Sequence, residues 1–326
     1  MTSLGITLMV LTGLGVFLYA IDLLSQALRS IASDRMERWL KRYTSHVLSA
    51  VGVGIVATTL LDSSSVVIIL VIVLVNSGKL ALRNAMAVVL GANIGTTFGS
   101  QIIAFDIGAW SAVPLFLGIL LAHLGRTPSA KGAGNVLTGF GLLFTGLFLM
   151  GNAVEPLRDS TVLKGLLHGL EDPLKGSLFG GLITLVLQSS SATVAMAIAL
   201  AGKGLLSLPA GIAVMLGAEL GTCSDTLLAA ARCARRARKV GLFHLLFNLA
   251  SIILGLLLIH PFTDLVVWIS GTADDARRIA NAHVLFNTVG VLVCLPFLKS
   301  AERLLDKWLP EKATAHKHRI PHEMAA

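Results

Sequence analysis

Charged residues are scarce in this sequence, where Asp, Glu, Lys and Arg make up 13% of 326 residues, against about a quarter of a soluble chain. Hydrophobic residues make up 55%, and the mean hydropathy is +0.81. Apolar stretches long enough to cross the roughly 30 Å hydrocarbon core recur along the whole chain. The shortage of charge excludes a water-soluble protein and predicts an all-α polytopic membrane protein, because helices satisfy the backbone in lipid.

Cysteine and aromatic residues are also few. The three cysteines, Cys223, Cys233 and Cys294, have neither paired nor metal-ligand spacing, which argues against a disulfide framework and a zinc site. Aromatic residues make up 6% of the chain and are not interleaved with its basic runs. The net charge of +8 therefore predicts cytoplasmic loops and not a nucleic-acid partner. No cofactor or metal beyond a coupling ion is expected.

The sequence repeats itself at an offset of 126 residues. The matches that carry the weight are Gly, Ser and Thr, since apolar chains often agree at Leu, Val and Ala by chance. They include Gly54 and Gly180, Thr58 and Thr184, Ser63-Ser64-Ser65 and Ser189-Ser190-Ser191, and Gly95-Thr96 and Gly221-Thr222. We therefore divide the chain into a first half (1–135), a second half with one extra span (136–300) and a basic cytoplasmic tail (301–326).

Each half contains an apolar segment broken by its serine triplet. The pieces are 47–61 and 66–76 in the first half, and 176–187 and 192–202 in the second. Each piece is too short to span a bilayer, so each pair predicts a re-entrant hairpin with the serines near the midplane.

Spans are expected around each hairpin. In the first half they are 4–24, 85–104 and 108–125, with a basic connection after the first; in the second they are 136–153, 211–230 and 240–260. Three crossings per half would invert the second half relative to the first, as in many secondary transporters. A further segment, 281–298, completes the spans.

The basic residues predict the orientation. With the Arg232–Lys239 loop inside, 20 Lys and Arg residues lie inside and 6 outside. By the positive-inside rule this favours an outside N-terminus and a cytoplasmic C-terminus in the plasma (inner) membrane.

The serine triplets predict an anion site. Three serines at the start of an apolar half-helix combine free backbone N–H groups, hydroxyl donors and the positive end of a helix dipole. Two such helix starts approaching from opposite sides would hold one oxyanion between Ser63, Ser64, Ser65 and Ser189, Ser190, Ser191. Helix capping or close helix packing is the alternative explanation.

Two acidic residues break the repeat. Asp62 precedes the first triplet where Gln188 precedes the second, and Glu219 stands where its repeat mate is Asn93. A charge at the bilayer centre is unfavourable by roughly 2.5–3.5 kcal/mol, so Asp62 is a candidate coupling-ion residue, with an N-cap as the alternative. Glu219 is a candidate cation or proton site, with a surface-proximal or hydrogen-bonded structural role as the alternative.

Two His-x-x-x-Asn pairs lie in the second half. His244 with Asn248, and His283 with Asn287, each share a helix face. They predict hydrogen bonds between helices, with a proton relay as the alternative, and they provide no metal site.

The triplet with its preceding Gln, the segment Gly-Ala-Asn-Ile-Gly-Thr-Thr at 91–97 and the His-x-x-Phe-Asn segments resemble the type II sodium/phosphate cotransporter family over about residues 10–298. That resemblance implies paired Gln-Ser-Ser-Ser motifs on inverted hairpins that contribute to sodium and phosphate sites. Gln188 with its serines fits fully, whereas Asp62 replaces the first Gln. The candidate coupling-cation residues are Asp62, Gln188, Asn93, Thr96, Glu219 and Thr222.

The function expected is cation-coupled symport of inorganic phosphate, with sodium or a proton as the coupling ion. The alternatives are a carrier or channel for another small oxyanion, or a serine-dependent membrane enzyme with a histidine base. Besides phosphate, the expected partners are membrane lipid and a second copy in a homodimer.

Overall fold

The chain is helical throughout the part that a computed structural model describes, residues 3–105, 108–157 and 160–310, and no strand occurs in these ranges. The prediction of an all-helical membrane protein is confirmed. The helices of the first half are α1 (Ser3–Tyr43), α2 (Val47–Leu61), α3 (Ser64–Asn76), α4 (Leu82–Ile103), the 3-10 helix η1 (Gly108–Trp110) and α5 (Ala112–Leu124).

The rest of the chain contains more helices than the first half. They are α6 (Pro128–Val154), η2 (Glu155–Leu157), α7 (Thr161–Gly169), α8 (Pro173–Leu187), α9 (Ser190–Gly202), α10 (Leu208–Gly221), α11 (Cys223–Ala231), α12 (Arg235–Leu257), α13 (Ile259–Ser270), α14 (Asp275–Cys294), η3 (Leu295–Phe297) and α15 (Leu298–Trp308).

Both predicted hairpins are present. Helices α2 and α3 of the first half, and α8 and α9 of the second, are 13 to 15 residues long, too short to cross a bilayer. Six helical stretches are long and apolar enough to do so by length and composition. They are Leu4–Leu28, Leu82–Ile103, Pro128–Leu157, Leu208–Ala231, Arg235–Leu257 and Asp275–Trp308.

Some expected boundaries were wrong. The basic connection expected after residue 24 continues α1 to Tyr43, because no Gly or Pro between Val16 and Tyr43 interrupts the helix. The expected span 108–125 is divided into the short η1 and the 13-residue α5, so it does not count among the six. The expected span 211–230 is confirmed as the stretch Leu208–Ala231, in which α10 and α11 meet at Thr222. Residues 311–326 of the tail lie outside the described ranges.

The core consists of the hairpins packed on two central helices, α4 and the α10–α11 pair. In both, 67% of the most apolar stretch is buried inside the protein, against 17% in α1. Glycines allow this packing: a Cβ on Gly91 would overlap the carbonyl oxygen of Val51 in α2, and one on Gly217 would overlap that of Ser177 in α8. Both contacts are related by the offset of 126, so the repeat in sequence is a repeat in packing.

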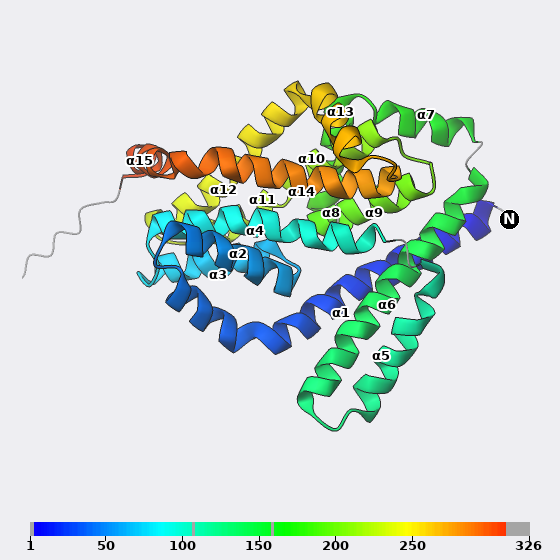
Figure 1. Ribbon diagram of the computed structural model, residues 1–326, viewed down its shortest axis with the longest axis horizontal. Helices are drawn as coiled ribbons and strands as arrows, with labels where there is room; N and C mark the ends of the chain where they lie inside the picture. Colours follow the sequence, from blue (N-terminus) through cyan, green and yellow to red (C-terminus); the bar gives the residue numbers. More distant parts are fainter. Residues whose placement is uncertain (1–2, 106–107, 158–159, 311–326) are drawn as a thin grey trace, which may run out of the picture.

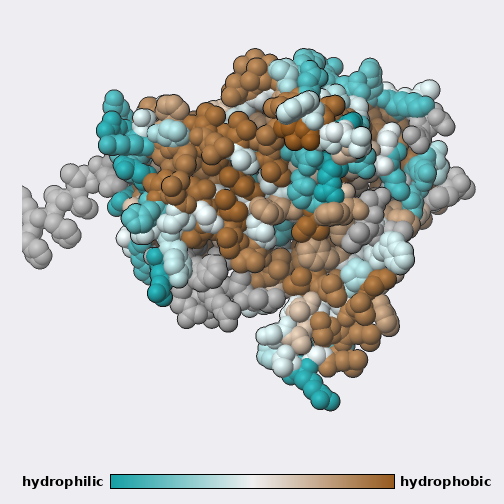
Figure 2. Space-filling model, viewed as in Figure 1, coloured by the Kyte–Doolittle hydropathy of each residue, from teal (hydrophilic) through white to brown (hydrophobic). Residues whose placement is uncertain are grey.

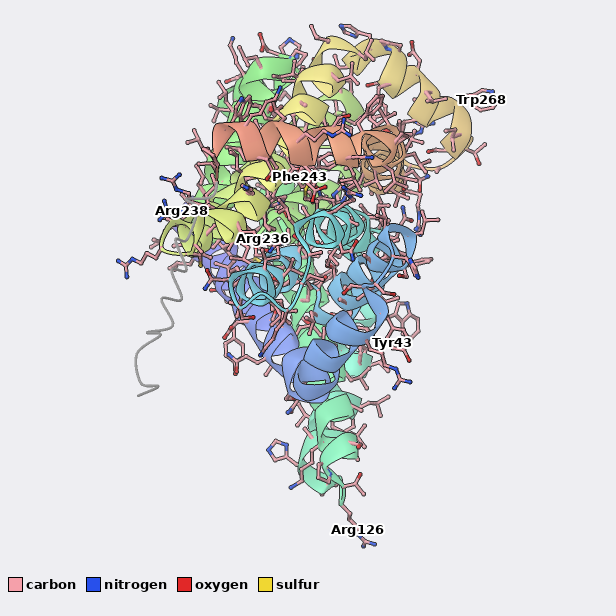
Figure 3. The ribbon with its side chains drawn as sticks, turned by 90° about the vertical axis from the view of Figure 1, so that its left-hand side faces the viewer. Tyr43, Arg126, Arg236, Arg238, Phe243 and Trp268 are labelled. Carbon is pink, nitrogen blue, oxygen red and sulfur yellow. The ribbon has the colours of Figure 1, made fainter. Side chains whose placement is uncertain are left out.

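Helices α5 and α6 form an antiparallel pair that projects from the rest of the molecule, and α6 also packs along α1 (Figure 1). Arg126 lies at the tip of this pair (Figure 3). The start of α1 and helix α15 lie at opposite ends of the central helices (Figure 1). The inverted relation of the two halves and the orientation of the termini remain predictions.

The surface is that of a membrane protein. Hydrophobic residues cover the middle of the face shown in Figure 2, and hydrophilic residues gather at its two ends. Helices α4 and α14 run lengthwise between the two ends of this face (Figure 1). A hydrophobic middle between two hydrophilic ends is expected where lipid hydrocarbon surrounds the middle of the helices and water surrounds their ends.

Candidate functional site

The two hairpins turn through the same backbone conformation. Asp62 ends α2 with φ 47° and Gln188 ends α8 with φ 56°, and no other non-glycine residue in the described ranges has a positive φ. A left-handed conformation is unfavourable by about 1–2 kcal/mol for a residue with a side chain, which glycine would avoid. Polar side chains at both tips despite this strain point to a functional role.

The first serine of each triplet is a helix cap. Ser63 accepts a hydrogen bond from the Val66 N–H at 3.4 Å, and Ser189 accepts one from the Ala192 N–H at 3.2 Å. The capping interpretation is confirmed for these two serines. The N-cap interpretation of Asp62 is wrong, because Asp62 lies one residue earlier and is the C-cap of α2.

The middle serine of each triplet is buried and unpaired. Ser64 is 6% exposed and Ser190 is 4% exposed, and neither hydroxyl forms a hydrogen bond with another residue of the described ranges. Each serine lies in the first turn of its half-helix, where backbone N–H groups have no partner within the helix. Each tip therefore offers hydrogen-bond donors and a helix dipole to an anion.

The carboxylate of Asp62 is also unpaired. Its Oδ1 atom lies 3.0 Å from the position that a Cβ on Gly99 of α4 would occupy. Asp62 forms no hydrogen bond or ion pair within the described part of the chain. The tip of the first hairpin thus presents a carboxylate without a counter-charge.

One contact joins the two halves at this site. The Ser65 hydroxyl donates to Asp225 Oδ2 in α11 at 3.2 Å. The Ser224 hydroxyl lies 2.9 Å from the Gly221 carbonyl oxygen and 3.3 Å from Asp225 Oδ1. The first serine triplet therefore lies against the central helix of the second half. This is the arrangement that an anion site shared between halves requires.

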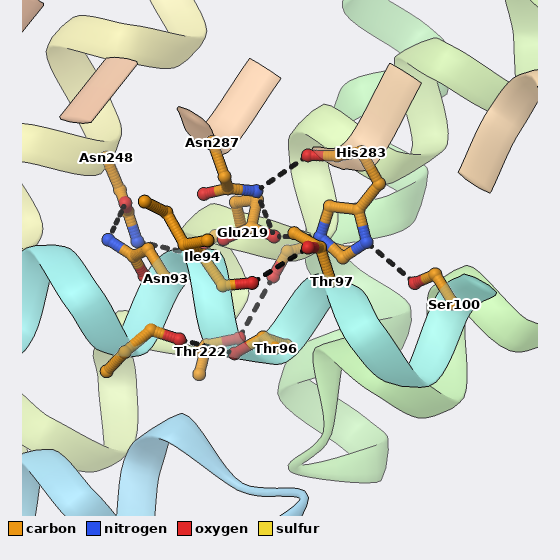
Figure 4. Close-up of polar contacts among 12 residues, drawn as sticks. Asn93, Ile94, Thr96, Thr97, Ser100, Glu219, Thr222, Asn248, His283 and Asn287 are labelled. Carbon is orange, nitrogen blue, oxygen red and sulfur yellow. Dashed lines mark hydrogen bonds and ion pairs between the residues drawn. The ribbon is translucent and has the colours of Figure 1, made fainter. Parts of the chain in front are cut away.

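A buried polar layer crosses the centre of the bundle beside the hairpins (Figure 4). Glu219 is 3% exposed, and His283 Nε2 lies 2.6 Å from Glu219 Oε1. His283 Nδ1 lies 2.7 Å from the Ser100 hydroxyl of α4, and Asn287 Nδ2 donates to Glu219 Oε1 at 3.4 Å. Through these contacts, α14 links α10 to α4.

His244 has a different environment. Its Nε2 lies 3.2 Å from Asn248 Nδ2, and its Nδ1 lies 2.9 Å from the Thr226 hydroxyl. An amide nitrogen can only donate, so Nε2 accepts and His244 is neutral. Thr226 follows Ser100 by 126 residues, so the two histidines contact equivalent positions of the two halves. They differ because His283 has a carboxylate partner.

The remaining candidates lie in the same layer. Asn93 Nδ2 donates to Asn248 Oδ1 at 3.3 Å. Thr96 and Thr222 are buried and donate to carbonyl oxygens in their own helices, those of Ala92 and Ala218. Hydrogen bonding between helices by the His-x-x-x-Asn pairs is confirmed.

Three residues of the site escaped the sequence analysis: Ser100, Thr226 and Asp225. The offset of 126 relates Ser100 to Thr226, so a search for polar pairs in repeat register would have found them. Asp225 has Gly99 as its repeat mate and gave no such signal. Only its contact with Ser65 reveals its position.

The comparison with known proteins identifies the family. A family model described as Na+/Pi-cotransporter matches the chain twice, over residues 16–152 and 149–299. The chain belongs to the Na+/Pi-cotransporter family. The resemblance inferred from the serine motifs is thus confirmed. The members of this family transport phosphate and are not enzymes.

Relatives of this Na+/Pi-cotransporter family member include bacterial and animal proteins. An uncharacterized Bacillus subtilis protein, YqeW, is 31% identical over 303 residues, which cover 91% of this chain and 96% of YqeW. Escherichia coli YjbB, named as a candidate inorganic phosphate export protein, is 30% identical over 297 residues, 90% of this chain and 54% of YjbB. The chain thus spans about half the length of YjbB.

A shorter match connects the chain to an animal transporter. Human sodium-dependent phosphate transport protein 2B is 29% identical over 104 residues, 31% of this chain and 15% of that protein. No solved structure matches the chain.

Proposed function

We propose that the protein is a cation-coupled carrier of inorganic phosphate, with sodium or a proton as the coupling ion. The observation that carries this proposal is the pair of equivalent hairpin tips. Each holds a buried serine whose hydroxyl has no partner in the described ranges, at the start of a 13-residue helix. Donors of this kind, removed from water, suit a multivalent oxyanion.

The coupling follows from charge. Asp62 places an unpaired carboxylate at the first tip. A phosphate anion beside this carboxylate would be repelled unless a cation or a proton neutralised the carboxylate. Cation binding at Asp62 therefore favours phosphate binding at the serines, which is thermodynamic coupling. Gln188, with a neutral side chain at the equivalent position, provides an amide oxygen as a further cation ligand.

The direction of transport is set by the gradients, because a coupled carrier is reversible. The name of YjbB describes export, whereas the animal relatives are named sodium-dependent phosphate transport proteins. Both directions use the same site, so phosphate export is a second candidate function for this chain.

Purified protein in liposomes tests the proposal. Uptake and efflux of radiolabelled phosphate are measured under an imposed sodium gradient, an imposed pH gradient, or neither. One of the two gradients, sodium or pH, should drive phosphate accumulation. Competition by unlabelled sulfate tests the selectivity for phosphate. Phosphate flux that is independent of both gradients would show a passive channel and refute the coupling.

Serine variants test the site. Ser64→Ala and Ser190→Ala each remove one hydroxyl donor and should weaken apparent phosphate affinity by about 5- to 150-fold, corresponding to roughly 1–3 kcal/mol. Ser49→Ala is the control, because the Ser49 hydroxyl is bonded to the His46 carbonyl at 2.9 Å, away from the tips. Wild-type affinity in both tip variants would contradict the site.

A further inference from the structure

The two halves place their acidic residues on different elements of the same site. In the first half, Asp62 at the hairpin tip lies against Gly99 of the central helix α4. The offset of 126 converts this pair into Gln188 and Asp225. The first half thus has an acidic tip and a glycine on its central helix, and the second half has a neutral tip and an acidic central helix. In sequence register, each half therefore has one carboxylate at this pair of positions.

Within the described ranges, no basic residue forms an ion pair with either carboxylate. Asp62 forms no bond with the described part of the chain, and the contacts of Asp225 there are the hydroxyls of Ser65 and Ser224. Both residues are partly buried beside apolar helices. An ionised carboxylate in such surroundings requires a counter-charge, and the protein offers neither of them one in the ranges described.

The hydroxyl groups around Asp225 can serve as cation ligands. Ser65 reaches Asp225 from the serine triplet of the other half, and the neighbouring Ser64 is buried with an unpaired hydroxyl. Carboxylate, hydroxyl and carbonyl oxygens are the ligands that a hard monovalent or divalent cation prefers. A cation at Asp225 would therefore lie directly beside the donors proposed for the anion.

We propose that Asp225 is a coupling-cation ligand like Asp62, so that each half supplies one carboxylate to a monovalent-cation site beside the first serine triplet. The first half supplies it from the hairpin tip and the second half from the central helix. This inference rests on the proposed function. It also explains why Asp62 breaks the repeat. The first half has its carboxylate at the hairpin tip and the second half has it on the central helix, so each half has one carboxylate at these positions.

Exchange of the carboxylate between its two positions tests the equivalence. Asp62→Gln should raise the sodium concentration for half-maximal phosphate uptake by about tenfold or more, because the first subsite loses its charge. Adding Gly99→Asp to the Asp62→Gln variant gives the first half the same residues at these two positions as the second half. This double variant should have a sodium concentration for half-maximal uptake within about threefold of wild type. Only Asp62 atoms lie within 4 Å of a Cβ on Gly99, the nearest at 3.0 Å, so the new side chain requires only the side chain at residue 62 to shift.

Three further variants separate charge from shape. Asp62→Gln with Gly99→Asn has the same size without the charge and should stay impaired. Gly99→Asp alone brings two carboxylates together and should also be impaired. Asp225→Gly with Gln188→Asp gives the second half the arrangement of the first and should work, whereas Asp225→Asn alone should not. If Asp225→Asn matches wild type, or if neither exchange restores function, the inference is wrong.

Stability measurements detect cation binding to each variant independently of phosphate transport, and show whether the variant is folded. Thermal unfolding in detergent, with sodium chloride replaced by choline chloride, reports cation binding without transport. Sodium should stabilise the wild type and the two exchanged variants, and should stabilise Asp62→Gln and Asp225→Asn less. If a pH gradient alone drives the wild type, the same variants are compared by their pH dependence. Wild-type flux that ignores both gradients overturns the proposed function, whereas coupled wild-type flux with unaffected Asp225→Asn overturns only this inference.

Discussion

Replacement of His283 by alanine should destabilise the protein much more than the same replacement at His244. Both side chains are fully buried, at 0% exposure, and both follow the same His-x-x-x-Asn pattern. The difference lies in their partners. His283 is bonded to the carboxylate of Glu219 at 2.6 Å, whereas His244 is bonded to the Asn248 amide and the Thr226 hydroxyl.

The magnitude follows from what each change leaves behind. Loss of His283 leaves the Glu219 carboxylate buried, at 3% exposure, with only a 3.4 Å contact to Asn287. A buried charge without its partner destabilises by about 3–5 kcal/mol. Loss of His244 leaves neutral groups unpaired, which destabilises by about 1–3 kcal/mol. The cavity is the same size in both variants, so the packing loss is similar.

The assay is thermal unfolding of purified protein in detergent, read as loss of the monodisperse peak in size-exclusion chromatography. We expect the order of stability to be wild type, His244→Ala and then His283→Ala. The Glu219→Gln background provides the control: without the carboxylate, His283→Ala should destabilise no more than His244→Ala. Equal losses in the wild-type background, or an undiminished loss in Glu219→Gln, would refute the importance of the Glu219–His283 contact.

Two other predictions concern packing and topology. Gly217→Ala should strongly destabilise the protein or displace the second hairpin, because its Cβ would overlap the Ser177 carbonyl oxygen, whereas Gly165→Ala in α7 has open space and should be neutral; unfolding temperatures of the two variants decide this. Single cysteines at Lys131 and in the Arg232–Lys239 loop of a cysteine-free variant should react with an impermeant thiol reagent only from the cytoplasmic side. Labelling of either position from outside would overturn the proposed orientation.

The helix breaks at the serine triplets were predictable because their signals are local. A serine that interrupts an apolar segment favours a helix start, because its hydroxyl can accept a hydrogen bond from a backbone N–H of the first turn. Ser63 and Ser189 are such N-caps. The length of α1 was missed because basic residues were taken as a connection, although basic residues are good helix formers and no Gly or Pro breaks the run. The hydrophobic pattern identifies buried segments, but not where each helix ends.

Composition and the 126-residue repeat determined that this is a helical membrane protein with two serine-tipped hairpins, because burial in lipid and local helix breaks are written in short stretches of sequence. Only the tertiary structure decided which polar groups meet. Glu219 and His283 are 64 residues apart in the chain, and Ser65 and Asp225 are 160 apart. Such partners are set by how α4, α10, α11 and α14 cross in the core. Helix crossings depend on close packing between distant segments, and no periodicity within one segment encodes them.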